Sequence, residues 1–235
     1  MSLTEDTVLN MLKDSKIIKN GHFLLRSGLH SDTYIQKDDI LIPPYIRNLI
    51  VDQIVTKCVK FLNLQVRNRT GKYEDYVITG PATAGSSFAI LVADKLELPF
   101  VYCEKENLEK DIIDIFHHTL SKGTLHNTKD YIKQLKNKRK MVFRPNFAKF
   151  LVKPKNKKVI IVEDIITTGG SVDKTIEAVN KCGATVDCIV SIWNRGNYEP
   201  INSLIINSLI NKNVVSYKPE DCPMCKNNIE LTTLK

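Results

Sequence analysis

Short runs of consecutive apolar residues alternate along the chain with longer segments of helical periodicity. Four runs have the length and composition of strands: 76–79, 100–103, 158–162 and 185–193. Three segments repeat apolar residues at three- and four-residue steps, as helices do: 44–62, 86–96 and 171–181. Because strands buried on both faces are apolar throughout, this alternation predicts one α/β domain over 1–235, with a mainly parallel sheet flanked by helices.

The start of the chain follows another pattern. Thr4 can cap a first helix whose apolar residues Val8, Leu9 and Leu12 share one face. Residues 21–42 mix apolar residues with Ser, Gly, His and Asp, which predicts extended segments joined by turns.

A polar, Lys- and Asn-rich stretch at 107–140 interrupts the alternation, with helical spacing only at 112–120 and 131–135. Connections of this length are uncommon inside a compact domain. We therefore expect an insertion that is a decoration, a lid or a disordered loop.

The composition disfavours several classes of protein. Hydrophobic residues make up 43% and charged residues 26% of the 235 residues, as in globular proteins. No apolar run approaches the roughly 18 residues of a membrane span, and the acidic start lacks the layout of a secretory signal. We expect a cytoplasmic protein with reduced cysteines and no membrane partner.

The formal net charge of +8 is concentrated in one block. Residues 129–158 hold 12 Lys and Arg against a single acid, Asp130. The block is either a solvated surface or an attractor of polyanions, including nucleic acid. Its few aromatic residues argue against a platform for single-stranded nucleic acid, so we do not expect nucleic acid as the main partner.

Among six cysteines, only Cys222 and Cys225 form a close pair. A structural zinc site needs four ligands, and no second pair lies at finger spacing. His117, His118 and His126 could complete such a site only through long-range folding. The pair is thus a metal site, a redox pair or a turn with two partly buried thiols.

The sharpest chemical signal follows the 158–162 run. Two adjacent carboxylates, two glycines, three hydroxyl side chains and a helix start come in order: Glu163, Asp164, Thr167, Thr168, Gly169, Gly170, Ser171. The glycines allow backbone N–H groups to converge on an anion, and the helix N-terminus adds partial positive charge. The segment matches neither the lysine-containing phosphate loop nor the dinucleotide turn.

The carboxylates would repel a phosphate unless they face sugar hydroxyls or Mg²⁺. The residues therefore indicate a phosphorylated sugar held at both ends. The alternative is an ordinary strand–loop–helix corner with incidental acids.

The 163–171 segment resembles the phosphoribosyl-pyrophosphate (PRPP) motif of the type I phosphoribosyltransferases. The resemblance implies their fold, in which the acidic pair Glu163 and Asp164 holds the ribose hydroxyls. The loop from Thr167 to Ser171 then binds the 5-phosphate.

Residues 21–34 resemble the F-x-L-x-S-G-x-x-S-x-x-Y stretch of orotate phosphoribosyltransferases, which contributes to a hood over the base. The hood would span 1–42, with Ser27, Gly28 and Tyr34 near orotate. A polar turn and plain packing are the alternatives for these residues. Arg26 would face pyrophosphate or solvent.

Three further segments match that family in order. The 80–85 segment resembles a loop near pyrophosphate, although many relatives carry a basic residue where Thr83 and Ala84 stand. Arg195 is placed to contact the orotate carboxylate, together with Thr167, unless it is a strand-end surface residue. The 219–225 segment is similar to a C-P-x-C tail found in one branch.

The catalytic loop of the family is harder to place. Lys105 matches its start and is the first candidate for the catalytic lysine, with Lys110 second. Arg144 matches one Arg of its end, while Pro145 and Asn146 replace the Arg and Gly that follow.

The resemblance implies transfer of phosphoribosyl from PRPP to orotate, giving orotidine 5-monophosphate and pyrophosphate in pyrimidine biosynthesis. It implies Mg²⁺ held mainly by PRPP, and a homodimer with shared active sites. Lys105, Arg144 and Asp164 would be the catalytic residues. Two alternatives stay open: transfer to another base, and a PRPP-sensing regulator that binds nucleic acid through 129–158.

Overall fold

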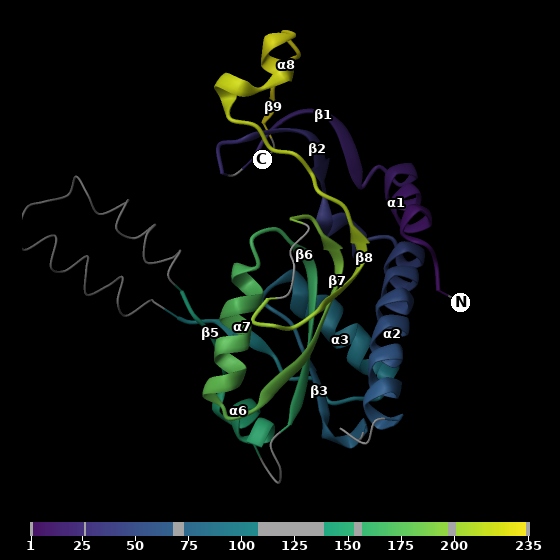
Figure 1. The fold of residues 1–235 in the computed structure, drawn as a ribbon, viewed down its shortest axis with the longest axis vertical. Coiled ribbons are helices and arrows are strands. Elements are labelled where there is room, and N and C mark those ends of the chain that lie inside the picture. The colour runs from purple at the N-terminus through teal and green to yellow at the C-terminus, as the bar shows by residue number, and fades with distance from the viewer. Residues whose placement is uncertain are drawn as a thin grey trace, which may run out of the picture.

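The central sheet has four parallel strands in the order β3-β6-β7-β8 (Figure 1). A computed structural model describes residues 2–25, 27–67, 73–107, 139–152, 157–196 and 201–233. The strands are β3 (Tyr76–Thr79), β6 (Lys158–Ile166), β7 (Thr185–Asn194) and β8 (Ile206–Asn211). The predicted parallel sheet flanked by helices is confirmed, and β8 is a strand that the apolar pattern did not reveal.

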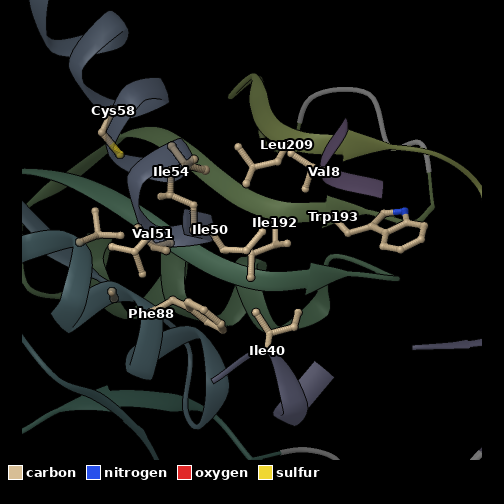
Figure 2. Packing of buried hydrophobic residues seen from close by; sticks show 14 of the residues in the cluster. Val8, Ile40, Ile50, Val51, Ile54, Cys58, Phe88, Ile192, Trp193 and Leu209 are labelled. Carbon is tan, nitrogen blue, oxygen red and sulfur yellow. The ribbon is translucent and has the colours of Figure 1, made fainter. Parts of the chain in front are cut away.

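Helices cover both faces of this sheet (Figure 1). One face packs against α1 (Glu5–Asp14), α2 (Pro44–Arg67) and α3 (Ala84–Leu96), and the other against α6 (Pro145–Val152) and α7 (Gly170–Lys181). Side chains of β6 alternate between the two layers, with Ile160 in the first cluster and Ile161 in the second. Figure 2 shows part of the first cluster, including Ile54, Phe88 and Ile192.

The N-terminal segment forms a second, smaller sheet beyond the carboxyl ends of β6, β7 and β8 (Figure 1). It consists of β1 (Ile18–Leu24), β2 (His30–Ile35) and the short C-terminal strand β9 (Thr232–Thr233). Strand β1 pairs antiparallel with β2 and parallel with β9. We call these three strands the hood sheet; the sequence indicated its first two strands only as extended segments.

Two links join the hood sheet to the rest of the chain. The 3₁₀ helix η1 (Lys37–Ile40) leads from β2 to the core, where Ile40 is fully buried. After β8, residues 212–233 form what we call the C-terminal tail, with η4 (Pro219–Asp221) and α8 (Pro223–Lys226). A further 3₁₀ turn, η2 (Tyr73–Asp75), precedes β3.

The 100–103 run does not form one strand of the central sheet. Phe100 makes a single parallel bridge to Ile78, and the chain then leaves as β4 (Cys103–Lys105). This strand pairs antiparallel with β5 (Met141–Phe143). The β4–β5 ribbon thus marks the two ends of the predicted insertion, whose residues 108–138 lie outside the described residues, as do its predicted helices.

The first helix begins as its sequence predicted. Thr4 accepts a hydrogen bond on its side-chain oxygen from the N–H of Thr7, at 3.2 Å, and Val8, Leu9 and Leu12 are buried. Among the described residues, no helix is both long enough and apolar enough to cross a membrane.

Candidate active site

The acidic pair stands near the carboxyl end of the central strand β6. Glu163 and Asp164 are 5% and 3% exposed. Each carboxylate accepts a backbone hydrogen bond: Glu163 Oε1 from the N–H of Asp164 at 3.0 Å, and Asp164 Oδ1 from the N–H of Ile165 at 2.7 Å. These local bonds fix the orientation of both side chains.

A lysine of the N-terminal segment forms an ion pair with one of these two carboxylates. The Lys37 ammonium at the start of η1 lies 2.7 Å from Asp164 Oδ2. Burial alone would lower the pKa of Lys37. The attraction and hydrogen bond of Asp164, together with the nearby Glu163 and Asp38, outweigh it, so the pKa is raised. The sequence does not reveal this role of Lys37, because the contact joins segments that are distant along the chain.

Burial raises the pKa of Glu163 well above its usual value of 4.5, and repulsion from the neighbouring Asp164 adds to the effect. The two adjacent carboxyl groups are therefore not equivalent. Asp164 has a cationic partner, whereas Glu163 keeps its proton to higher pH.

The loop between β3 and α3 packs directly against the acidic pair. A Cβ added to Gly85 would lie 2.6 Å from Glu163 Oε1 and 3.1 Å from the carbonyl oxygen of Val162. A Cβ on Gly80 would lie 2.5 Å from the same carbonyl oxygen. Only glycine permits this approach, so the predicted 80–85 loop lies beside the end of β6 with Thr83 exposed.

The predicted phosphate loop joins β6 to α7. Thr167, Thr168 and Ser171 are exposed, so their hydroxyl groups face outward from the loop. Gly169 has a φ of +73° and caps α7, and a Cβ there would lie 3.0 Å from Ile201 Cδ1. Exposed hydroxyl groups at the N-terminus of a 12-residue helix suit an anion.

Arg195 lies beside this loop, at the end of β7. Its backbone N–H donates to the carbonyl of Ile166 at 2.9 Å, which sets it next to the last residue of β6. Its guanidinium donates to Ser216 Oγ at 3.3 Å. Partial burial lowers the pKa of Arg195 from its usual value, but a guanidinium stays charged in proteins.

The predicted hood residues occupy two different environments. Ser27 and Gly28 are exposed in the turn between β1 and β2, where Gly28 has a φ of +84°. Tyr34 is half-buried and packs its ring against Phe23, with centroids 5.6 Å apart. The structure thus supplies a packing role for Tyr34, and contact of these residues with orotate stays a prediction. Arg26 lies outside the described residues.

Of the two predicted loop cations, Lys105 lies on the β4–β5 ribbon and Arg144 directly follows β5; the ribbon packs against α7. Arg144 makes a two-pronged ion pair with Glu104, at 3.0 and 3.1 Å. The hydrogen bond from Arg144 lowers the pKa of Glu104. Lys105 ends β4, opposite Met141. The charged partner that the structure gives Arg144 is Glu104 rather than Asp164. The second candidate, Lys110, lies outside the described residues.

Comparison with known proteins defines the class of the chain. Residues 50–221 match the phosphoribosyl transferase domain family. Since this match spans more than half of the sequence, the chain belongs to the phosphoribosyltransferases. The family assignment agrees with the PRPP-type loop and with the sheet that carries it.

Individual relatives refine the comparison. An orotate phosphoribosyltransferase of Thermotoga maritima is 28% identical over 222 residues, covering 94% of each chain. The solved orotate phosphoribosyltransferase of Aeropyrum pernix superposes with a TM-score of 0.54 at 22% identity, covering 86% of this chain and 92% of that one. An adenine phosphoribosyltransferase of Trypanosoma brucei gives the same TM-score at 19% identity, covering 89% and 82%. The fold is therefore shared by enzymes whose names give different bases.

Proposed function

We propose that the protein is an orotate phosphoribosyltransferase that makes orotidine 5-monophosphate from PRPP and orotate. The choice of orotate as the base rests on the position of Arg195. Its backbone is hydrogen-bonded to the end of β6, the strand that leads into the phosphate loop. A planar guanidinium suits the carboxylate of orotate, and purine bases have no such group. The relatives named for orotate, which align with nearly the whole chain, support the same choice.

The reaction is a displacement at C1 of PRPP. A ring nitrogen of orotate forms a bond to C1, the bond from C1 to the pyrophosphate oxygen breaks, and its electron pair leaves with pyrophosphate. The proton of the ring nitrogen is released. Little acid–base assistance is needed, so the protein acts mainly by positioning and by neutralising charge.

The residues at the end of β6 would hold the sugar. The hydroxyl groups of Thr167, Thr168 and Ser171, with the N-terminus of α7, would bind the 5-phosphate. The carboxyl groups of Glu163 and Asp164 would accept or share hydrogen bonds with the ribose hydroxyls, and Lys37 would keep Asp164 in place. The 80–85 loop would lie near pyrophosphate.

The donor set fits Mg²⁺ only as an ion that arrives with the substrate. Mg²⁺ prefers several oxygen ligands and retains water, but Asp164 is paired with Lys37, and burial raises the pKa of Glu163 above its usual value. PRPP oxygens would therefore supply most of the coordination, with the acidic pair adjacent. Bound Mg²⁺ would neutralise charge on the departing pyrophosphate.

We further propose that the protein is a homodimer with shared active sites. Lys105 lies on the ribbon beside α7 and Arg144 directly follows it, whereas the acidic pair lies near the carboxyl end of β6. A ribbon that served the partner's site would bring these cations to the departing pyrophosphate. We also propose a cytoplasmic location, which the six free cysteines support.

The test is consumption of orotate, followed by its absorbance, with PRPP and Mg²⁺ and then with Mg²⁺ removed. We expect turnover that needs both PRPP and the metal. Adenine, guanine, hypoxanthine and uracil serve as matched substrates. Turnover of one of these without turnover of orotate would contradict the proposal and assign another base.

A further inference from the structure

Two histidines of the hood sheet and two cysteines of the C-terminal tail meet in one cluster. His22 comes from β1, His30 begins β2, Cys222 precedes α8 and Cys225 lies within it. Their potential ligand atoms all lie within 4.8 Å of one another. In Figure 1 the hood sheet and α8 lie together, away from the central sheet.

The spacing within the cluster fits tetrahedral zinc. With zinc–nitrogen bonds of about 2.05 Å and zinc–sulfur bonds of about 2.3 Å, neighbouring sulfur and nitrogen ligands stand about 3.6 Å apart. Three of the four sulfur–nitrogen distances are 3.3, 3.4 and 3.6 Å. The nitrogens of His22 and His30 lie 2.8 Å apart, about 0.5 Å closer than in such a tetrahedron, so a bound ion would separate them slightly.

The orientation of His22 is already that of a metal ligand. Its Nδ1 lies 2.8 Å from the carbonyl oxygen of Ile229, to which it can only donate. The neutral ring then has its lone pair on Nε2, the atom that faces His30 and both cysteines. A backbone carbonyl that fixes the tautomer in this way is the usual outer partner of a zinc-bound histidine.

The tail buries few apolar side chains, although hydrogen bonds join it to Trp193 at Lys212 and to Ser31 at Val215. Between Lys212 and Thr233, only Cys222 and Met224 are buried. Strand β9 contributes two residue pairs to the hood sheet, and one backbone bridge joins His30 to Tyr217. A segment with so few buried apolar side chains is stabilised in other proteins by disulfides or by a structural metal.

We propose that His22, His30, Cys222 and Cys225 bind a structural zinc ion that fastens the C-terminal tail to the hood sheet. Thiolates and imidazoles favour Zn²⁺ over Mg²⁺ or Ca²⁺, which prefer oxygen ligands. Four protein ligands close the coordination sphere, as in structural rather than catalytic zinc sites. Three of the four residues are buried and Cys225 is the most exposed, so the ion would enter from its side.

The ion would also affect the candidate active site indirectly, through the C-terminal tail. The tail carries Tyr217, which pairs with His30, and the preceding residue Ser216, which accepts a hydrogen bond from Arg195. Fixing the tail therefore fixes one partner of Arg195. The zinc site itself does not depend on which base the enzyme uses.

The experiment measures metal in the full-length, untagged protein, purified with a reductant and without chelator. Mass spectrometry of the metal content should give about one zinc per chain. The Cys222→Ser/Cys225→Ser double variant should hold less than about a tenth of that amount. The matched control is Cys182→Ser, which removes a partly exposed thiol at the end of α7, outside the cluster, and should retain about one zinc.

A second measurement does not require the variant to fold. Cobalt added to the metal-free wild-type protein should give the visible bands of a tetrahedral ion and a thiolate charge-transfer band, and added zinc should abolish both. The proposal would be overturned if the purified wild-type protein contained no zinc and also gave no absorption bands with cobalt. A disulfide between Cys222 and Cys225 in the reduced preparation, found by peptide mapping, would do the same.

Discussion

Lys37 Nζ lies 2.7 Å from Asp164 Oδ2, so the first residue of η1, just after the hood sheet, is ion-paired to the acidic pair of the central strand. Lys37 is 46% exposed at its side chain, whereas Asp164 is 4% exposed. Loss of the lysine would leave a buried carboxylate without its cation. The pair therefore couples the position of the hood segment to the residue proposed to hold the ribose.

We expect Lys37→Met to lower the free energy of unfolding by about 1–2 kcal/mol, less than for a fully buried pair because Lys37 is partly solvated. We also expect kcat/KM for PRPP to fall about tenfold or more, because Asp164 loses its fixed position. Denaturant unfolding and initial-rate kinetics measure the two effects. Lys60→Met, an exposed lysine on α2, is the matched control and should change neither.

Glu163→Gln should stabilise the protein increasingly as the pH rises. In the wild-type chain the pKa of Glu163 is raised above its unfolded value of 4.5. The stability that the protonated group contributes is complete below about pH 4.5 and is lost as the pH rises through the folded pKa. Glutamine has no proton to lose, so the difference in Tm between variant and wild type should grow from about pH 5 to about pH 8.

The control for this pH series is Glu177→Gln, at an exposed position of α7. Its Tm difference from wild type should stay nearly constant over the same range. A Glu163→Gln difference that is flat, or that shrinks with rising pH, would show that the buried carboxyl is ionised in the folded protein.

Gly85→Ala should destabilise the protein by about 1–3 kcal/mol, because the new methyl group meets Glu163 Oε1 and two neighbouring groups of the packed loop. The same shift displaces the acidic pair, so kcat/KM for PRPP should also fall. Gly170→Ala is the matched control for stability, since a Cβ there has no neighbour closer than 3.7 Å. Equal Tm values for the two variants would contradict the close approach of the 80–85 loop to β6.

Arg195→Ala should raise the KM for orotate by about 100-fold while changing the KM for PRPP less than about threefold, as expected for the loss of one charged, hydrogen-bonded contact. Steady-state kinetics with each substrate varied in turn gives both values. Ser216→Ala removes only the partner of the guanidinium and should have a smaller effect in the same direction. Similar increases in both KM values would reject Arg195 as the carboxylate contact.

Mixing two inactive variants tests the shared active site. In a dimer whose ribbon serves the partner, Lys105→Ala and Asp164→Asn chains damage different halves of one site. Co-refolded or exchanged mixtures should regain up to about a quarter of wild-type activity, since half of the dimers are mixed and each has one intact site. A chain carrying both substitutions, mixed with either variant, is the control. No recovery in mixtures shown to contain mixed dimers would place Lys105 in its own chain's site.

The central sheet and the phosphate loop were predictable from local sequence. The features that the sequence did not reveal depend on contacts between residues far apart along the chain. The phosphate loop was predictable because the strand, the loop and the helix start that form it are contiguous from Lys158 to Lys181. Lys37 was missed because its partner lies far along the chain. His22 and His30 stand about 190 residues before Cys222 and Cys225, so the sequence does not show that two histidines and a C-x-x-C pair form one set of four metal ligands.

Short elements were also difficult to predict from the sequence. Strand β9 has two residues and depends on pairing with β1, so no apolar pattern announces it. The 100–103 run looked like a strand, but only Phe100 pairs with the central sheet before the chain turns into the β4–β5 ribbon. Helix α6 follows Arg144 where the sequence had indicated only the end of a loop.

The β4–β5 ribbon also explains how the domain can accept a long insertion at this point. Glu106 donates its backbone N–H to the carbonyl of Lys140 at 2.9 Å, so the two ends of the inserted sequence are already in contact. The entropy of closing a loop grows only with the logarithm of its length, about 0.6 kcal/mol for each doubling. Length at this position is therefore nearly neutral for folding of the core, which leaves the inserted sequence free to change during evolution without disturbing the sheet that carries the acidic pair.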